Sequence, residues 1–260
     1  MRYQIYPSDL TNEQWQFIQP LLPFSRAGKP RQDSLRGVVN AIFYLHHTGC
    51  PWRYLPRSYP HWSRCYYYFS RWSRAGNWER ICHALHALAR EKIGRSSLPH
   101  LAIIDSQSVR AARGEERAFD GFKKVMGRKR NILVDALGII FACKVHAADQ
   151  QEQITGKKIL DNLPKAYEEN LEKIIADRAY QRAFLEHAEV YHQIPVEISD
   201  QKLTGTKMKP FRWVVERTFA WLNHYRRMSR DYERKVRNSE SMLYLSMLPI
   251  LLRRITATIS

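Results

Sequence analysis

Three acidic residues in this sequence stand where a carboxylate could do chemistry. Asp105 follows the apolar run 101–104, Asp177 follows the short run 173–176, and Glu216 lies in a segment with helical spacing. Carboxylate oxygens are the ligands that Mg²⁺ requires, so two acids after strands and one on a helix could converge on divalent metal. Two such ions can clamp the attacking and leaving oxygens of a phosphodiester.

Each acid also has a purely structural interpretation. Arg212 lies one helical turn before Glu216, so the two side chains could form a surface ion pair of little energetic value. Acids are common in loops at strand ends, but an unpaired carboxylate beside a buried strand is costly unless it is paired or binds metal. The helix around Glu216 can pack through an apolar stripe made of Phe211, Val214, Val215, Phe219 and Leu222.

The charge balance points to a polyanionic partner. The formal net charge is +17, the pI is about 9.9, and residues 1–100 carry 14 Lys and Arg against 5 Asp and Glu. Such a chain favours nucleic acid or an anionic surface as its partner. Residues 1–6 contain no apolar core of a signal peptide, and the apolar stretch 242–252 is far shorter than the ~20 residues that span a bilayer. We therefore expect a cytoplasmic protein that binds nucleic acid and no membrane.

The four cysteines do not predict a zinc site, because none forms a Cys-x-x-Cys pair. A site could still be assembled from six thiol and imidazole side chains, namely His46, His47, Cys50, Cys82, His83 and His86. Singly buried Cys and His side chains are the commoner arrangement. The thiols are expected to be reduced.

Residues 9–95 have the pattern of an all-helical region. Ser34 is a candidate N-cap of a helix that ends at Gly49, and further helices are expected at about 62–72 and 78–92. A helix, a constrained turn and a helix rich in Tyr and Arg are compatible with a helix-turn-helix, although the turn is long. The arginines of that last helix that would contact DNA are Arg64, Arg71 and Arg74. In the alternative interpretation they form a solvated face over an aromatic core.

After residue 98 the pattern becomes that of an α/β fold. The expected strands are 101–105, 131–135, 139–146, 174–177 and 196–199, and the expected helices are 152–162, 181–188, 210–228 and 239–255. This order predicts a mixed β-sheet flanked by helices. Two polar segments, 106–129 and 200–209, are predicted to be mobile loops.

Seven segments spread along nearly the whole chain resemble one family. They are LTNEQW at 10–15, TGCPWR at 48–53, YYYF at 66–69, IDSQSV at 104–109, KKVMGRKR at 123–130, ADRAY at 176–180 and RWVVERTFAWL at 212–222. In these motifs the chain resembles the DDE transposases of bacterial insertion sequences, specifically the insertion-sequence-five group. The resemblance implies a DNA-binding region at 1–97, followed by a ribonuclease-H-like catalytic domain at 98–260.

The resemblance also implies the chemistry. Asp105, Asp177 and Glu216 would be the catalytic triad that holds two Mg²⁺ ions, with Mn²⁺ as a substitute. The substrates would be double-stranded terminal inverted repeats and target DNA, with a homodimer joining paired ends in the bacterial cytoplasm at the nucleoid. Besides the three arginines named above, the predicted DNA-binding residues are Lys123, Lys124, Arg128, Lys129, Arg130, Arg178, Arg212, Arg217 and Arg226.

Three positions depart from the family pattern, and two other functions remain open. Ala179 stands where relatives usually have Gly, Lys209 where many have Tyr, and Asn223 where Lys is usual, although Arg226 could reach the same phosphate. None of these positions is an expected metal ligand. The alternatives are a decayed transposase that only binds DNA, and a related metal-dependent nuclease that cuts without joining.

Overall fold

The structure is a computed structural model. It describes residues 5–23, 33–112, 114, 116–199 and 212–257. Within these ranges, no helix is both long enough and apolar enough to cross a bilayer.

Residues 12–92 form a helical region, as predicted. Its helices are α1 (Asn12–Ile18), η1 (Gln19–Leu21), α2 (Leu35–Thr48), η2 (Trp52–Tyr54), α3 (Trp62–Arg74) and α4 (Asn77–Lys92). Ser34 caps α2 by accepting a hydrogen bond from the Gly37 N–H, and Gly49 ends it in the left-handed conformation. A buried face of α3 with Cys65, Phe69 and Trp72 holds it against its neighbours.

The remainder is a mixed sheet with helices. Its elements are β1 (Leu101–Arg110), β2 (Ala118–Asp120), β3 (Val125–Asp135), β4 (Ile140–Ala147), α5 (Glu152–Asp161), α6 (Lys165–Asn170), β5 (Lys173–Ala176), α7 (Arg182–His192), β6 (Val196–Ile198), α8 (Arg212–Asn223), η3 (Arg226–Met228) and α9 (Val236–Thr256). The strand order is β2-β3-β1-β5-β6, with β4 also paired to β3. The β1–β3 and β3–β4 pairs are antiparallel, whereas β1–β5 and β5–β6 are parallel.

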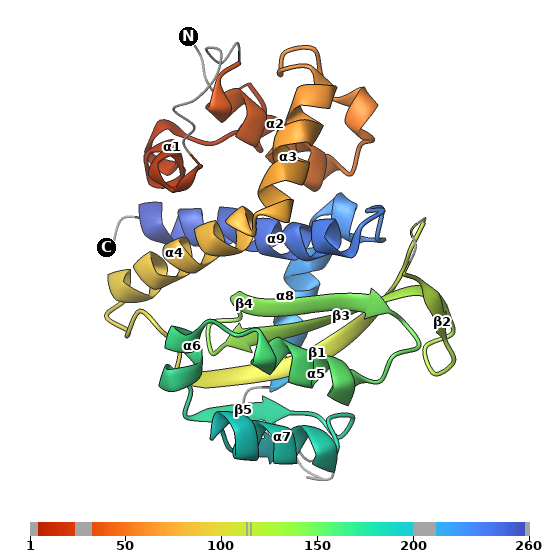
Figure 1. The fold of residues 1–260 in the computed structure, drawn as a ribbon. Helices are drawn as coiled ribbons and strands as arrows, with labels where there is room; N and C mark the ends of the chain where they lie inside the picture. The colour runs from red at the N-terminus through yellow and green to blue at the C-terminus, as the bar shows by residue number, and fades with distance from the viewer. Residues whose placement is uncertain (1–4, 24–32, 113, 115, 200–211, 258–260) are drawn as a thin grey trace.

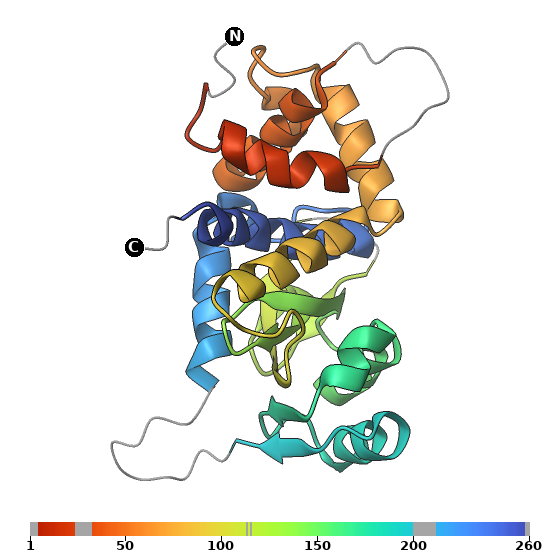
Figure 2. The ribbon, with the colours of Figure 1, turned by 90° about the vertical axis from the view of Figure 1, so that its left-hand side faces the viewer.

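Helices cover the sheet on two sides. Figure 2 shows α8 on one side and α5, α6 and α7 on the other. Because successive side chains of a strand point to opposite faces, the sheet separates two hydrophobic clusters. Ile103 and Ile175 point into the cluster that contains α8, α9 and the N-terminal helices, whereas Ile104 and Ile174 point toward α5 and α7.

The C-terminal helix α9 joins the helical region to the sheet. In Figure 1 it runs beside α4, between the sheet and α1–α3. Leu245, Leu248 and Leu252 of α9 are fully buried in the same cluster as Val38 and Ile42 of α2. The hydrophobic core is therefore continuous across residue 97, where the sequence suggested a boundary between two domains.

Two expectations about this part of the chain need correction. The segment 106–129 is not one loop as predicted, because β1 continues to Arg110, β2 spans Ala118–Asp120 and β3 begins at Val125. The expected helix 210–228 is shorter, since α8 ends at Asn223 and a separate 3-10 turn follows. The other predicted loop, 200–209, lies outside the described residues.

Candidate active site

Asp105 lies on β1, and Asp177 directly follows β5, the parallel strand beside it. The last registered pair of β1 and β5 is Ile103 with Ile175, and each aspartate stands two residues further along the chain. Side chains two residues apart on a strand share a face, so Asp105 points to the side covered by α8, and Asp177 lines the same small hollow. The sequence suggested that the strand ends at Asp105. In the structure Asp105 lies midway along β1, level with the end of β5.

The two carboxylates share an environment that disfavours negative charge. Burial is the main reason that the pKa of Asp105 is raised to about 7, and the charges of Asp177 and Glu152 add to this effect. Burial likewise raises the pKa of Asp177, again with a contribution from Glu152. Backbone N–H groups partly offset the cost, since Ser106 donates to Asp105 at 2.7 Å and Ala179 donates to Asp177 at 2.9 Å.

Arg212 brings positive charge to this pair from the first turn of α8. It lines a small hollow together with both aspartates, and its charge lowers the pKa of each. Its Nε atom also lies 3.3 Å from the Oε1 atom of Glu216, whose side chain is 61% exposed. Among the described residues, the carboxylates of Asp105, Asp177 and Glu216 do not lie within 4.8 Å of one another as a set of metal ligands.

A fourth acid, Glu152, lies close to the aspartates although sequence reasoning did not select it. Its Oε1 atom accepts a hydrogen bond from the Ser106 hydroxyl at 2.6 Å and lies 3.4 Å from the Nζ atom of Lys129. An acid in the first turn of a helix is ordinary helix chemistry, so the sequence alone gave no signal. Lys129 is 12% exposed and points at Glu152 and Asp120.

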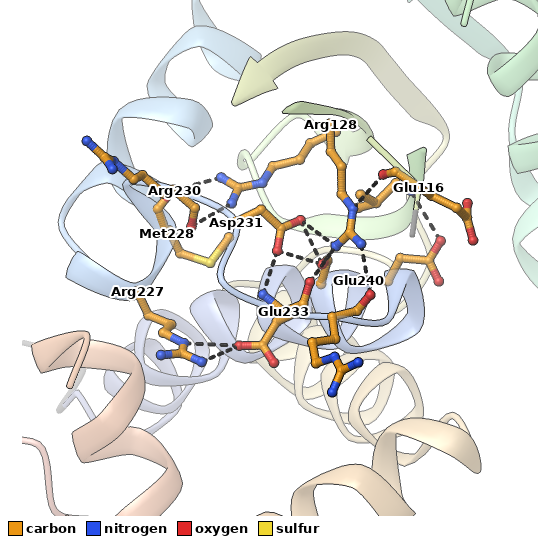
Figure 3. A network of polar contacts seen from close by, with 12 residues as sticks. Glu116, Arg128, Arg227, Met228, Arg230, Asp231, Glu233 and Glu240 are labelled. Carbon is orange, nitrogen blue, oxygen red and sulfur yellow. Dashed lines mark hydrogen bonds and ion pairs between the residues drawn. The ribbon is translucent and has the colours of Figure 1, made fainter. Parts of the chain in front are cut away.

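Arg128 and Arg130 are buried and are not available to DNA in this structure, contrary to the prediction. Arg128 is 0% exposed and donates to the Asp231 carboxylate, to the Ser239 hydroxyl and to backbone carbonyls (Figure 3). Arg130 donates to the Met228 carbonyl, and burial lowers its pKa to about 10. Arg128 and Arg130 lie on the same face of β3 as Ile132. The segment 226–239 covers this face, so both arginines stabilise the fold.

Other predicted DNA-binding residues are exposed in two places. On α3, Arg64, Arg71 and Arg74 lie on the side away from the buried face, with Arg64 2.9 Å from the Asp33 carboxylate and Arg71 donating to Tyr67. Lys123 and Lys124 lie at the exposed turn before β3. These positions leave the basic groups accessible to phosphate.

The remaining basic residues differ in their surroundings. Arg178 and Arg226 are exposed, the first directly after Asp177. Arg217 is held between two indole rings, its guanidinium carbon 4.5 Å from the Trp213 centroid and 4.7 Å from that of Trp221. Such stacking fixes Arg217 to its own helix.

Two of the three departures from the family pattern, Ala179 and Asn223, lie among the described residues, and the structure accommodates both. Ala179 is not among the described residues with positive φ, so its backbone does not require glycine, and its N–H binds Asp177. Asn223 is exposed at the end of α8. Lys209 lies outside the described residues.

The six thiols and imidazoles considered for zinc do not gather. His46 contacts the Ser246 hydroxyl at 2.9 Å, His86 contacts Asp135 at 3.0 Å, and Cys82 contacts the Ile140 carbonyl at 3.6 Å. Within the described ranges these six provide no group of three close ligand atoms. His46, Cys82 and His86 are singly buried side chains with partners of their own, whereas His47 is exposed and Cys50 and His83 are half-buried.

Comparison with known proteins gives two matching family models. Residues 10–82 match the family described as "Putative transposase of IS4/5 family", and residues 96–250 match the family described as "Transposase DDE domain". A curated relative, "Putative transposase for insertion sequence element IS402" from Burkholderia cepacia, is 28% identical over 116 residues. That alignment covers 42% of this chain and 55% of the relative, so the chain spans about half of its length. No solved structure matches the chain.

The second family model covers more than half of the chain and includes both aspartates and Glu216. The observed mixed sheet between helices agrees with the ribonuclease-H-like fold of that domain. From these matches and this architecture, the chain belongs to the DDE transposases of the IS4/5 family.

Proposed function

We propose that this protein binds the terminal inverted repeats of an insertion sequence, cleaves the DNA ends and joins them to target DNA. The observation that carries the proposal is the pair Asp105 and Asp177, which line one small hollow beside the parallel strands β1 and β5 in a chain with net charge +17. The family membership supports it.

The aspartates suit a divalent cation. Burial raises the pKa of both carboxylates and the charge of Glu152 adds to it, so a bound cation would relieve an electrostatic cost. Their oxygens are ligands that Mg²⁺ accepts, and Mn²⁺ is a plausible substitute. When bound, two such ions would polarise the scissile phosphate and activate water or a 3′-hydroxyl for in-line attack.

We assign complementary tasks to the residues around the aspartates. Asp105 and Asp177 would hold the cations from the sheet, and Glu216 would complete the set from α8. Glu152 adds negative charge beside Asp105 and positions Ser106 through their hydrogen bond. Arg212, already beside the aspartates, then becomes free to pair with a phosphate oxygen.

DNA binding is assigned to the exposed basic residues alone. The α3 arginines would lie against the repeat sequence, whereas Lys123 and Lys124 would contact backbone phosphates near the active site. Arg178 and Arg226 are further candidates because both are exposed. Joining two ends suggests a homodimer on DNA.

The test is cleavage and joining of labelled duplexes that carry the flanking inverted repeats, in Mg²⁺, Mn²⁺ or EDTA. Wild type, Asp105→Asn and Asp177→Asn are compared with Glu172→Gln, a control acid whose side chain is 77% exposed and distant from the site in the fold. We expect cut and joined products in either metal, lost in EDTA and in both aspartate variants, and retained in the control.

Other outcomes separate the alternatives. Metal-dependent cutting without joined products, on supplied target DNA, would identify a nuclease. Binding to the repeats without cutting in either metal would identify a DNA-binding protein that has lost its catalytic activity. Cleavage that persists in Asp177→Asn would reject the assignment of this site.

A further inference from the structure

A cluster of two imidazoles and two carboxylates lies on the side of the sheet opposite α8, outside the candidate active site. It joins Asp161 at the end of α5, Glu168 on α6, and His187 and His192 on α7. Figure 2 shows these three helices together on that side. Glu152 and Asp161 are the first and last residues of α5, so the cluster lies nine residues from Glu152, about 14 Å at the usual helical rise.

Three ligand atoms converge in this cluster. The Nε2 atoms of His187 and His192 lie 2.7 and 3.2 Å from the same oxygen, Oδ1 of Asp161. All three atoms lie within 4.8 Å of one another. Tetrahedral zinc bonds of roughly 2.0–2.1 Å separate neighbouring ligand atoms by about 3.3 Å, so only a small expansion would admit an ion.

The hydrogen bonding of His192 points to a cation. Its Nδ1 atom lies 2.6 Å from Oε1 of Glu168, while its Nε2 atom faces Asp161, so a carboxylate oxygen stands against each ring nitrogen. A neutral imidazole carries one N–H and can satisfy only one of them, whereas an imidazolium can donate to both. With a neutral ring whose Nδ1 donates to Glu168, the lone pair of Nε2 faces Asp161, and a metal ion between them would convert that repulsion into coordination.

The surrounding side chains match a built metal site. A metal-ligating histidine commonly donates its other N–H to a carboxylate, which is the place that Glu168 occupies. The side chains of His187 and His192 are 17% and 10% exposed, whereas Asp161 is 48% exposed and leaves room for water. Three protein ligands with an open position are a common zinc arrangement.

We propose that Asp161, His187 and His192 bind a transition-metal ion, with zinc as the best fit, and that Glu168 positions His192. Two nitrogen ligands and one oxygen favour zinc over Mg²⁺, which takes oxygen ligands. The ion would fasten the end of α5 to α7, and α7 follows directly after the Asp177 turn. The proposed ion would therefore join two helices, and the site stands independently of the proposed reaction.

The test is calorimetric titration of the metal-free full chain with Zn²⁺ at pH 7.5, in millimolar Mg²⁺ to occupy the catalytic acids. Wild type is compared with Asp161→Asn, His187→Gln and Glu168→Gln, and with the control His100→Gln, an exposed histidine beside Glu172. Co²⁺ added in place of Zn²⁺ reports the ligand geometry through its visible absorption. Circular dichroism in EDTA confirms that each variant is folded.

We expect one ion per chain, a visible Co²⁺ spectrum and a Tm that rises with Zn²⁺. Asp161→Asn and His187→Gln should abolish these responses, and Glu168→Gln should weaken binding roughly tenfold or more. Binding should survive in His100→Gln and in Asp177→Asn. Absence of Zn²⁺ binding in wild type, or binding unchanged in folded Asp161→Asn, would overturn the proposal and leave an ion-pair network.

Discussion

Arg212 pairs with Glu216 while its guanidinium lines the same hollow as Asp105 and Asp177. One cation thus lies near all three acids of the expected triad. Glu216 is exposed, whereas the two aspartates are half-buried and their pKa values are raised. Arg212 therefore supplies positive charge beside the acids, and it would compete with a bound metal ion for Glu216.

The first prediction concerns Arg212→Ala. Removing its charge should raise the pKa of Asp105 further above 7, because Arg212 is one of the groups that lower it. The carboxyl ¹³C shift of labelled Asp105, followed against pH in EDTA, measures this directly. Arg182→Ala is the matched control, since that side chain is 91% exposed and pairs with Glu186. An unchanged titration of Asp105 in Arg212→Ala would contradict the electrostatic link.

The second prediction concerns Glu152→Gln. Its charge raises the pKa of both aspartates, so the substitution should lower both values. The same ¹³C titration in EDTA tests this, with Glu172→Gln as the control. We also expect weaker Mg²⁺ binding, because one negative charge near the cation site is lost. An unchanged pKa of Asp177 in Glu152→Gln would show that the charge of Glu152 does not act on Asp177.

The third prediction is a pH dependence of stability without metal. The pKa of Asp105 is raised in the folded state, so the folded chain holds this proton more tightly than the unfolded chain between pH 3.8 and about 7. Stability is therefore lost as pH rises through this window and levels off above it. From pH 5.5 to 8, wild type should lose about 1–2 kcal/mol relative to Asp105→Asn. Urea unfolding in EDTA at both pH values provides the measurement, and a difference of opposite sign would refute the assignment.

The fourth prediction separates Arg128 from the neighbouring lysines by stability. Arg128→Met should lower the free energy of unfolding by about 3–5 kcal/mol, because Asp231 loses its buried cationic partner and several carbonyls lose a donor. Lys123→Ala should change it by less than about 0.5 kcal/mol, since that side chain is exposed. Urea titration of the two variants measures both free energies of unfolding. Equal losses of stability would contradict the different environments of the two residues.

The fifth prediction concerns the contribution of Lys123 and Lys124, in the exposed turn before β3, to DNA affinity. Lys123→Ala and Lys124→Asn should each reduce the slope of log affinity against log salt by about 0.9, the value for one phosphate contact. Asparagine is chosen at position 124 because φ there is 53°, a conformation that Asn tolerates. Fluorescence anisotropy with a repeat duplex at several salt concentrations gives the slopes. Unchanged slopes would move the phosphate contacts elsewhere on the surface.

The sequence was sufficient for most elements and selected two aspartates that the fold brings to one hollow. Apolar runs ending in an acid located Asp105 and Asp177, and cap residues such as Ser34 located helix starts. The sequence misled at Arg128 and Arg130, because a basic run resembles a loop until the strand is known to begin at Val125. Positions 128 and 130 then fall on the same strand face as the core residue Ile132.

The residues that sequence reasoning missed depend on distant partners. Glu152 matters because Ser106 lies 46 positions before it and becomes its neighbour only in the fold. Asp161 meets His187 and His192 across 26 and 31 positions, which no local spacing rule detects. Local patterns locate side chains along one element, whereas these sites arise where separate helices meet a sheet.

The position of α9 has a consequence for how the protein is made. The helices that we assign to DNA binding complete their apolar core with Leu245, Leu248 and Leu252, which are among the last described residues to be synthesised. The helical region therefore cannot complete its core before the sheet, which lies between it and α9 in the sequence, has been translated. Truncated chains that lack α9 would leave this core open and would be less stable than the full chain.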